Sequence, residues 1–184
     1  MTTPRVERRL AAILAADIVG YSRLVEQGEA GTLEAIRDLR ERIVDPLLAE
    51  HQGRIVKLMG DGAIIEFGSV VDAVACAVAI QQGVAERQTT VPTARRIIFR
   101  IGINLGDVVV ECADLLGDGV NIAARLEQLC EPGGVLISGT AYDQLQGKHA
   151  HSVDALGERS LKGIERPIRT YAVRTGTGRP GATS

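Results

Sequence analysis

The chain has 184 residues, of which 45% are hydrophobic and 24% are charged, as in an ordinary globular domain. Its formal net charge of −2 gives no bulk attraction to nucleic acid, and no apolar run reaches transmembrane length, so neither nucleic acid nor membrane insertion is expected. The three cysteines Cys76, Cys112 and Cys130 lack C-x-x-C spacing and are odd in number, which favours a reduced cytoplasmic protein over a zinc site or a disulfide framework.

The first predicted element is a strand over residues 10–18, a nearly continuous apolar run typical of a strand buried on both faces. Asp17 is the only charge in this run. A buried carboxylate is costly unless it has a partner, a proton or a metal ion, so Asp17 is a candidate site residue. The alternative is that Asp17 caps a helix that starts near Tyr21.

Residues 32–50 have the apolar periodicity of a helix, which Pro46 either kinks or divides. Residues 54–67 predict a hairpin of two short strands, because Asp-Gly is flanked there by apolar runs. The two glycines beside Asp61 are expected to take positive φ and to present its carboxylate at the tip. An isolated aspartate in such a turn is most simply a solvated turn residue, but Asp17 provides a second carboxylate in similar surroundings.

The order of the elements predicts an α/β (α+β) sandwich, in which helices cover a mostly antiparallel sheet. The later elements are a helix over 70–84, a second hairpin with strands 97–103 and 108–110, a helix over 115–129, a strand over 135–137, a helix over 139–145 and a strand over 170–173. We expect one domain over residues 10–174, between a flexible N-terminus (1–9) and a disordered tail (175–184).

The predicted helix over 115–129 carries a second candidate pair. Asn121 and Arg125 are four residues apart and therefore share one helix face, where they could also be an ordinary surface pair. Neither a P-loop nor a G-x-G-x-x-G motif is present, so a nucleotide enzyme has to use another route. Two carboxylates at strand ends offer such a route, because Mg²⁺ is often held by one or two carboxylates together with substrate phosphates.

Four motifs then occur together in one order: Ala-Asp-Ile-Val-Gly-Tyr-Ser over 16–22, Lys-Leu-Met-Gly-Asp-Gly over 57–62, Arg-Ile-Gly-Ile-Asn-Leu-Gly-Asp-Val over 100–108, and Gly-Asp-Gly-Val-Asn-Ile-Ala-Ala-Arg-Leu-Glu over 117–127. Together they resemble the class III adenylate/guanylate cyclase catalytic domain over residues 8–174, with wording closest to rhizobial and mycobacterial members. The resemblance implies a ferredoxin-like βαββαβ core and sites formed between two head-to-tail domains.

The resemblance also implies roles for seven residues. They are Asp17 and Asp61 as ligands of two divalent cations (Mg²⁺ or Mn²⁺), Lys57 and Asp114 as readers of the purine, Asn121 and Arg125 as the transition-state pair, and Lys162 as a contact to the terminal phosphates. The implied reaction is conversion of ATP to 3′,5′-cyclic AMP and pyrophosphate by a homodimer with both halves of its sites. Alternatives are a guanylate cyclase and a nucleotide-sensing module without turnover. A diguanylate cyclase is not an alternative, because this sequence lacks the hairpin motif that such an enzyme requires.

Overall fold

The computed structural model describes residues 7–145, 147–148 and 151–176. In these ranges a single mixed sheet has the strand order β2-β3-β1-β4-β6-β8-β7, and β5 pairs with β4. The strands are β1 Glu7–Ile18, β2 Arg54–Met59, β3 Gly62–Phe67, β4 Phe99–Glu111, β5 Asp114–Leu116, β6 Val135–Ser138, β7 Val153–Arg159 and β8 Ile168–Val173. The helical segments are α1 Tyr21–Gln27, α2 Glu29–Leu39, η1 Arg40–Val44, α3 Asp45–Glu50, α4 Val70–Arg87, η2 Thr93–Arg95, α5 Asp118–Leu129 and α6 Gly139–Leu145.

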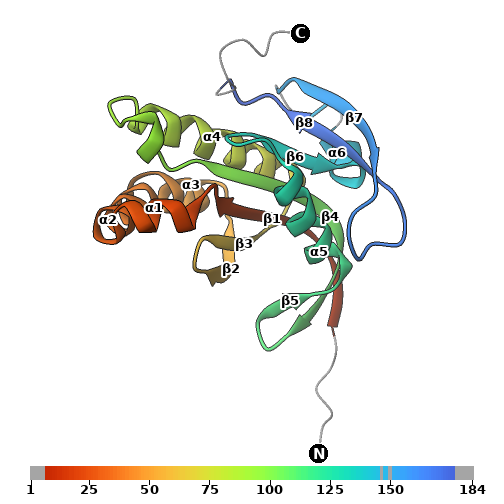
Figure 1. Cartoon of the computed structure of the whole chain (residues 1–184). Helices are drawn as coiled ribbons and strands as arrows, with labels where there is room; N and C mark the ends of the chain where they lie inside the picture. The colour runs from red at the N-terminus through yellow and green to blue at the C-terminus, as the bar shows by residue number, and fades with distance from the viewer. Residues whose placement is uncertain (1–6, 146, 149–150, 177–184) are drawn as a thin grey trace, which may run out of the picture.

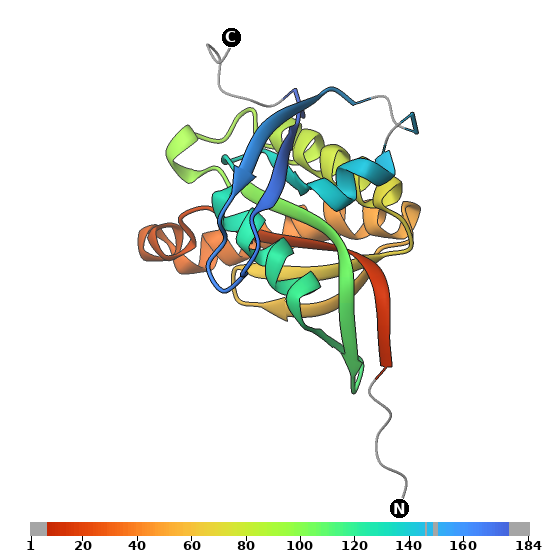
Figure 2. The same cartoon turned by 90° about the vertical axis from the view of Figure 1, so that its right-hand side faces the viewer.

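Strand β1 lies between β3 and β4 and is buried on both faces, as its apolar run predicts. Ala12 and Leu14 pack on the face covered by α4 and α6, whereas Ala11, Ile13 and Ala15 pack with α5 on the other face. Figure 2 shows α5 in front of the sheet, with α4 behind it. The predicted sandwich with a mostly antiparallel sheet is therefore confirmed, since only β4 and β6 pair in parallel among the described strands (Figure 1).

The second predicted hairpin is wrong. Strand β4 runs without a break through 104–107, and the chain turns instead at Cys112 and Ala113, where φ is 48° and 67°. Asn104, which suggested a turn, is satisfied inside the fold, because its side-chain amide is buried and donates to the Gly119 carbonyl at 3.0 Å, whereas Asp107 is exposed on the strand. Strand β7 was not predicted, because six of its seven side chains are exposed and show no alternation.

The helix predicted over 32–50 is continuous, because α2, η1 and α3 follow one another with helical dihedral angles at both junctions. Its middle part, Arg40–Val44, is a π-helix, and Pro46 comes just after it in α3. At the chain ends, β1 starts at Glu7, so residues 7–9 of the predicted flexible N-terminus are strand. Thr175 is buried, and the rest of the predicted tail from residue 177 onward lies outside the described residues.

Helix α5 lies directly against the backbone of β4. A Cβ on Gly102 would stand 2.4 Å from the backbone nitrogen of Glu127 and 2.5 Å from the carbonyl oxygen of Ala123. Both atoms belong to the helix backbone, so neither can swing aside. Glycine at this position therefore sets how closely α5 approaches the sheet. None of the helices in the described ranges is long and apolar enough to cross a membrane.

We expect Gly102→Ala to lower the free energy of unfolding by about 1–3 kcal/mol, because the added methyl forces α5 away from β4. The matched control is Gly31→Ala in α2, where a Cβ meets nothing within 4 Å. That substitution should raise the stability by about 0.5–1 kcal/mol through helix propensity alone. Urea unfolding followed by circular dichroism measures both. Equal effects of the two substitutions would contradict the close packing of α5.

Candidate active site

The two predicted metal aspartates meet at one end of the central strands. Asp17 pairs in register with Gly62, the residue after Asp61, and the Ile18 N–H donates to the Asp61 carbonyl at 2.8 Å. A Cβ on Gly62 would lie 2.8 Å from the carbonyl oxygen of Ala16, so glycine allows the hairpin to approach β1. The expected positive φ on either side of Asp61 is wrong, and Gly62 serves close approach instead.

The carboxylate of Asp17 forms an ion pair with Arg100. The two residues are opposite each other in β1 and β4, and the guanidinium donates to both carboxylate oxygens at 3.3 and 3.2 Å. Arg100 also donates to the Gln128 carbonyl at 3.2 Å, at the end of α5. The alternative that Asp17 caps a helix is wrong, since Gly20 is the N-cap of α1 and no side chain caps it.

A third carboxyl group, that of Glu127 on α5, joins this cluster. Its residue is 5% exposed, and its Oε1 atom has no hydrogen-bond partner among the described residues. Burial, a hydrogen bond to Asp17 and the negative charges of Asp17 and Asp61 together raise the pKa of Glu127 to about 8, against the opposing charge of Arg100. The cluster is therefore richer in acidic groups than in cationic ones.

Sequence reasoning assigned no role to Arg100 or Glu127, although both lie inside quoted motifs. The available signal was their type: each is a charged residue within a predominantly apolar element. Their meeting depends on the contact between β4 and α5, which periodicity alone does not reveal.

The residues present fit divalent cations. In the described ranges, no group of three or more His, Cys, Asp or Glu side chains is arranged to hold a metal ion. Two carboxylates together with waters and substrate phosphates are nevertheless a common Mg²⁺ site, and Asp17 with Asp61 provides two. The buried Oε1 of Glu127 has no hydrogen-bond partner among the described residues, so this cluster contains a polar oxygen that the fold itself does not satisfy.

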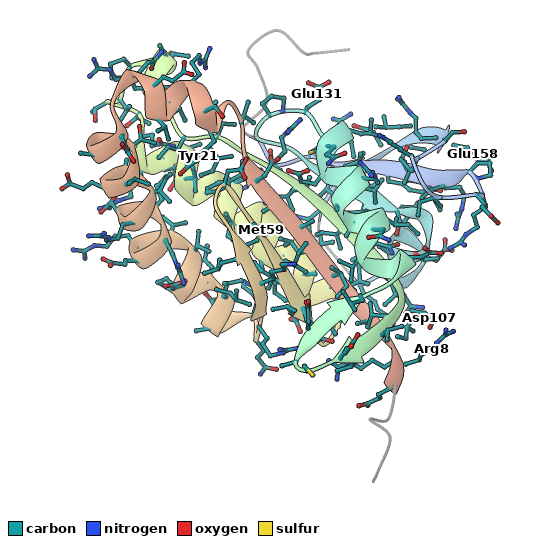
Figure 3. All side chains as sticks on the ribbon, turned by 60° about the horizontal axis from the view of Figure 1, so that its bottom comes forward. Arg8, Tyr21, Met59, Asp107, Glu131 and Glu158 are labelled. Atoms are coloured by element: carbon teal, nitrogen blue, oxygen red, sulfur yellow. The ribbon has the colours of Figure 1, made fainter. Side chains whose placement is uncertain are left out.

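The two predicted purine-reading residues lie on β2 and β5, two strands that are not paired with each other in the sheet. Lys57 is exposed on β2 and is paired with Ile64, which packs on the α5 side of the sheet. Asp114 begins β5, and its Oδ1 accepts a hydrogen bond from the Leu115 N–H at 2.8 Å. Strands β2 and β5 approach each other, so both residues lie at the same side of the molecule as the aspartates. Figure 3 shows Met59 of this hairpin between helices α1–α3 and α5.

Asn121 and Arg125 share one face of α5, as predicted from their spacing. Their neighbours Ile122 and Leu126 form the buried face, and Arg125 donates to the Gln128 side chain at 3.0 Å. No hydrogen bond or ion pair in the described part of the chain joins either residue to Asp17 or Asp61. The two pairs lie on different elements, with Asp17 and Asp61 at the end of β1 and the adjacent hairpin, and Asn121 and Arg125 away from the buried face of α5.

Lys162 is the remaining predicted site residue. It is exposed in the turn between β7 and β8, where Gly163 has φ 83°. Its neighbour Leu161 is buried against Ile122 and Leu126 of α5. This turn is thus fixed on the α5 face of the sheet, beside the helix that carries Asn121.

Comparison with known proteins gives one consistent family. Residues 6–175 match the model of the adenylate and guanylate cyclase catalytic domain. The chain is 46% identical over 171 residues to "Putative adenylate cyclase 3" of Rhizobium meliloti (strain 1021), covering 93% of this chain and 29% of that protein. It therefore spans less than a third of that relative's length.

Solved structures agree with this match. The adenylate/guanylate cyclase/hydrolase from Silicibacter pomeroyi is 42% identical with a TM-score of 0.83, covering 91% of this chain and 97% of that one. The adenylyl cyclase CyaB from P. aeruginosa is 25% identical with a TM-score of 0.79, covering 92% and 96%. Since the family match extends over nearly the whole chain and the same fold recurs in these structures, the chain belongs to the class III adenylate and guanylate cyclase catalytic domain family.

Proposed function

We propose that the chain is an adenylate cyclase that converts ATP to 3′,5′-cyclic AMP and pyrophosphate at two sites shared across a homodimer. One observation carries the proposal: Asp17 and Asp61 meet at one end of the sheet, while Asn121 and Arg125 occupy a separate, outward face of α5. A head-to-tail pair with twofold symmetry brings the aspartates of one protomer to the helix face of its partner, twice.

The reaction balances without a side chain as nucleophile. The 3′-oxygen of ATP bonds to the α-phosphorus, the bond from that phosphorus to the oxygen bridging to the β-phosphate breaks, and the hydroxyl proton leaves to solvent. Asp17 and Asp61 would hold two divalent cations, Mg²⁺ or Mn²⁺. Bound there, the cations lower the pKa of the 3′-hydroxyl and neutralise the triphosphate.

The other proposed residues orient the substrate. The planar guanidinium of Arg125 suits the charge that develops on the α-phosphoryl oxygens, and Asn121 orients the ribose. Lys162 supplies a positive charge to the terminal phosphates. Arg100 keeps the Asp17 side chain in place through its two hydrogen bonds, so the carboxylate faces the same point of the site before substrate arrives.

Base selection favours adenine over guanine. The ammonium group of Lys57 donates to adenine N1, and the carboxylate of Asp114 accepts from the 6-amino group. Guanine has a donor at N1 and an acceptor at O6, so both pairings would be mismatched. A guanylate cyclase is the second candidate, and the Lys57 and Asp114 pair argues against it. A nucleotide-binding module without turnover is the third, but both metal aspartates are present.

We retain a cytoplasmic setting as part of this proposal, because ATP is its substrate and the three cysteines are free thiols.

The substrate assignment predicts that the purified chain forms cyclic AMP from ATP in the presence of Mg²⁺ or Mn²⁺. The double substitution Lys57→Glu and Asp114→Cys should lower the ATP-to-GTP ratio of kcat/KM by about 10- to 100-fold. Two hydrogen bonds of about 1 kcal/mol or more would then favour guanine instead of adenine. Chromatography of the products measures both nucleotides. Arg54→Glu, a charge reversal on the same strand, is the control. An unchanged ratio in the double variant would refute the base-reading pair.

The shared site predicts that two inactive variants restore each other. Asp61→Ala damages the metal half of both sites in its own dimer, and Arg125→Ala damages the other half. After subunit exchange between equal amounts, about half of the dimers are mixed, and each mixed dimer has one intact site. Activity should therefore recover to roughly a quarter of wild type.

The control for this experiment is a mixture of Asp17→Ala with Asp61→Ala. Both changes affect the same half, so every site in the mixed dimer carries one defect and no activity returns. Differently labelled subunits report whether exchange took place. Demonstrated exchange without recovery in the first mixture would show that the site is not shared between protomers.

Glu127 predicts a pH dependence of stability in the metal-free chain. Its pKa is about 8 in the folded state against an ordinary value of 4.5, so the folded state holds a proton that the unfolded state has lost between these values. Stability should fall as pH rises through this window, by up to about 1.4 kcal/mol per pH unit from this group. Glu127→Gln should remove that part of the slope.

Urea unfolding in EDTA between pH 5 and pH 8 measures this slope. Glu131→Gln, which changes an exposed acid just after the same helix, is the control and should leave the slope as it is in wild type. Identical slopes for wild type and Glu127→Gln would contradict a proton held on Glu127.

A further inference from the structure

A cavity of about 330 Å³ lies between the sheet and the helical segment formed by α2, η1 and α3. Its helical wall consists of four side chains spaced four residues apart: Ile36, Arg40, Val44 and Leu48. An α-helix advances about 40° around its axis every four residues, which would carry such a row away from the sheet. The wider π-helical turn of η1 winds more slowly and keeps the row directed at the sheet. We call this space the helix–sheet cavity.

The opposite wall of the helix–sheet cavity is apolar. Leu14, Ile65 and Ile101 of three adjacent strands line it and are buried. At the β2 end the lining includes Leu58 and Met59, whose residues are 53% and 44% exposed. A cavity with apolar walls and exposed apolar side chains at one end suits a ligand with a hydrocarbon body.

The charges in this lining point to the other part of the ligand. Only Arg40 and Asp61 among the lining residues are charged. Asp61 belongs to the aspartate pair described above. Arg40 is paired with Asp45 at 3.6 Å, and both side chains are 47% exposed, so this ion pair contributes only about 0–1 kcal/mol. Its guanidinium can therefore turn to a better anionic partner, and a carboxylate matches its two-pronged geometry.

We propose that the helix–sheet cavity binds an aliphatic carboxylate, with its chain against the apolar sheet wall and its carboxylate on Arg40. The volume sets the length of the chain. A cavity of about 150 Å³ accepts benzene, so about twice that volume holds a chain of roughly ten to thirteen carbons. Such a ligand satisfies both parts of the lining, because its hydrocarbon leaves water and its charge gains a cation.

Binding in this cavity would touch the Asp61 hairpin from behind. Residues 60–62 are part of the lining, and so is Ala16 of β1. Successive residues of a strand face opposite sides, so Asp17 directs its carboxylate to the α5 side while Ala16 faces the cavity. A bound chain therefore restricts the hairpin that carries Asp61. This assignment does not depend on the reaction that the chain catalyses.

Isothermal titration of the full chain with decanoate, below its micelle concentration, tests the proposal. We expect saturable, equimolar binding to wild type and at least a tenfold weaker Kd for Arg40→Gln, because the charged hydrogen bonds are lost. Arg42→Gln lies on the same π-helical turn outside the lining and should stay within about twofold of wild type. Decanol, which has the same chain without the charge, should bind at least tenfold more weakly than decanoate.

Two cavity-filling variants locate the chain of the ligand. Val44→Phe fills the cavity from the helix, and Ala63→Leu fills it from the sheet. Each variant that retains the wild-type circular dichroism spectrum should lose saturable binding. In wild type, decanoate should slow amide hydrogen exchange at Asp61 and Gly62. Absence of saturable binding, an unchanged Kd in Arg40→Gln, equal binding of decanol, or full binding in a folded filled variant would each overturn the proposal.

Discussion

A carboxylate at the end of a strand that is buried on both faces has to be compensated, and this requirement explains much of the molecule. Asp17 ends β1, the strand on which β3 and β4 both pair. Its compensation comes from Arg100 across the sheet, and Glu127 approaches from α5 as a largely protonated neighbour. Because such groups interact only at short range, α5 has to lie close to β4, and Gly102 is the residue that permits this.

The two faces of the sheet consequently differ in character. The α5 face carries the charged groups near the end of β1, together with the exposed Lys57 on β2. The opposite face is apolar and is covered by α4, α6 and the helical segment around η1. The Asp61 hairpin lies between the two faces. Its backbone lines the helix–sheet cavity, and its Asp61 carbonyl accepts a hydrogen bond from the Ile18 N–H of β1. Strand alternation separates chemistry on one side from packing on the other.

Elements with one strong local signal could be predicted from the sequence. Strand β1 has a nearly continuous apolar run, the hairpin over 54–67 has Asp-Gly between apolar runs, and α5 has a helical pattern with glycines at its start. Each occurs within a few residues of its predicted position. Strand β4 was misjudged because Asn104 and the residues after it have the composition of a turn, although α5 satisfies the side chain of Asn104 inside the fold. Five of the proposed site residues fall on these well-predicted elements. The positions of Arg100 and Glu127 beside Asp17 could not be predicted, because they depend on the contact between β4 and α5, which is not local in sequence.

Helix α5 has a consequence for how a dimer would respond to substrate. Asn121 and Glu127 are six residues apart, about 9 Å along the helix axis. In the proposed dimer Glu127 faces the aspartates of its own protomer, while Asn121 and Arg125 face those of the partner. The backbone contact at Gly102 leaves the helix no slack against the sheet. In the proposed dimer, a nucleotide that displaces α5 together with its sheet at one site would also shift Arg125 at the other, and the dimer would bind its two substrates cooperatively rather than independently.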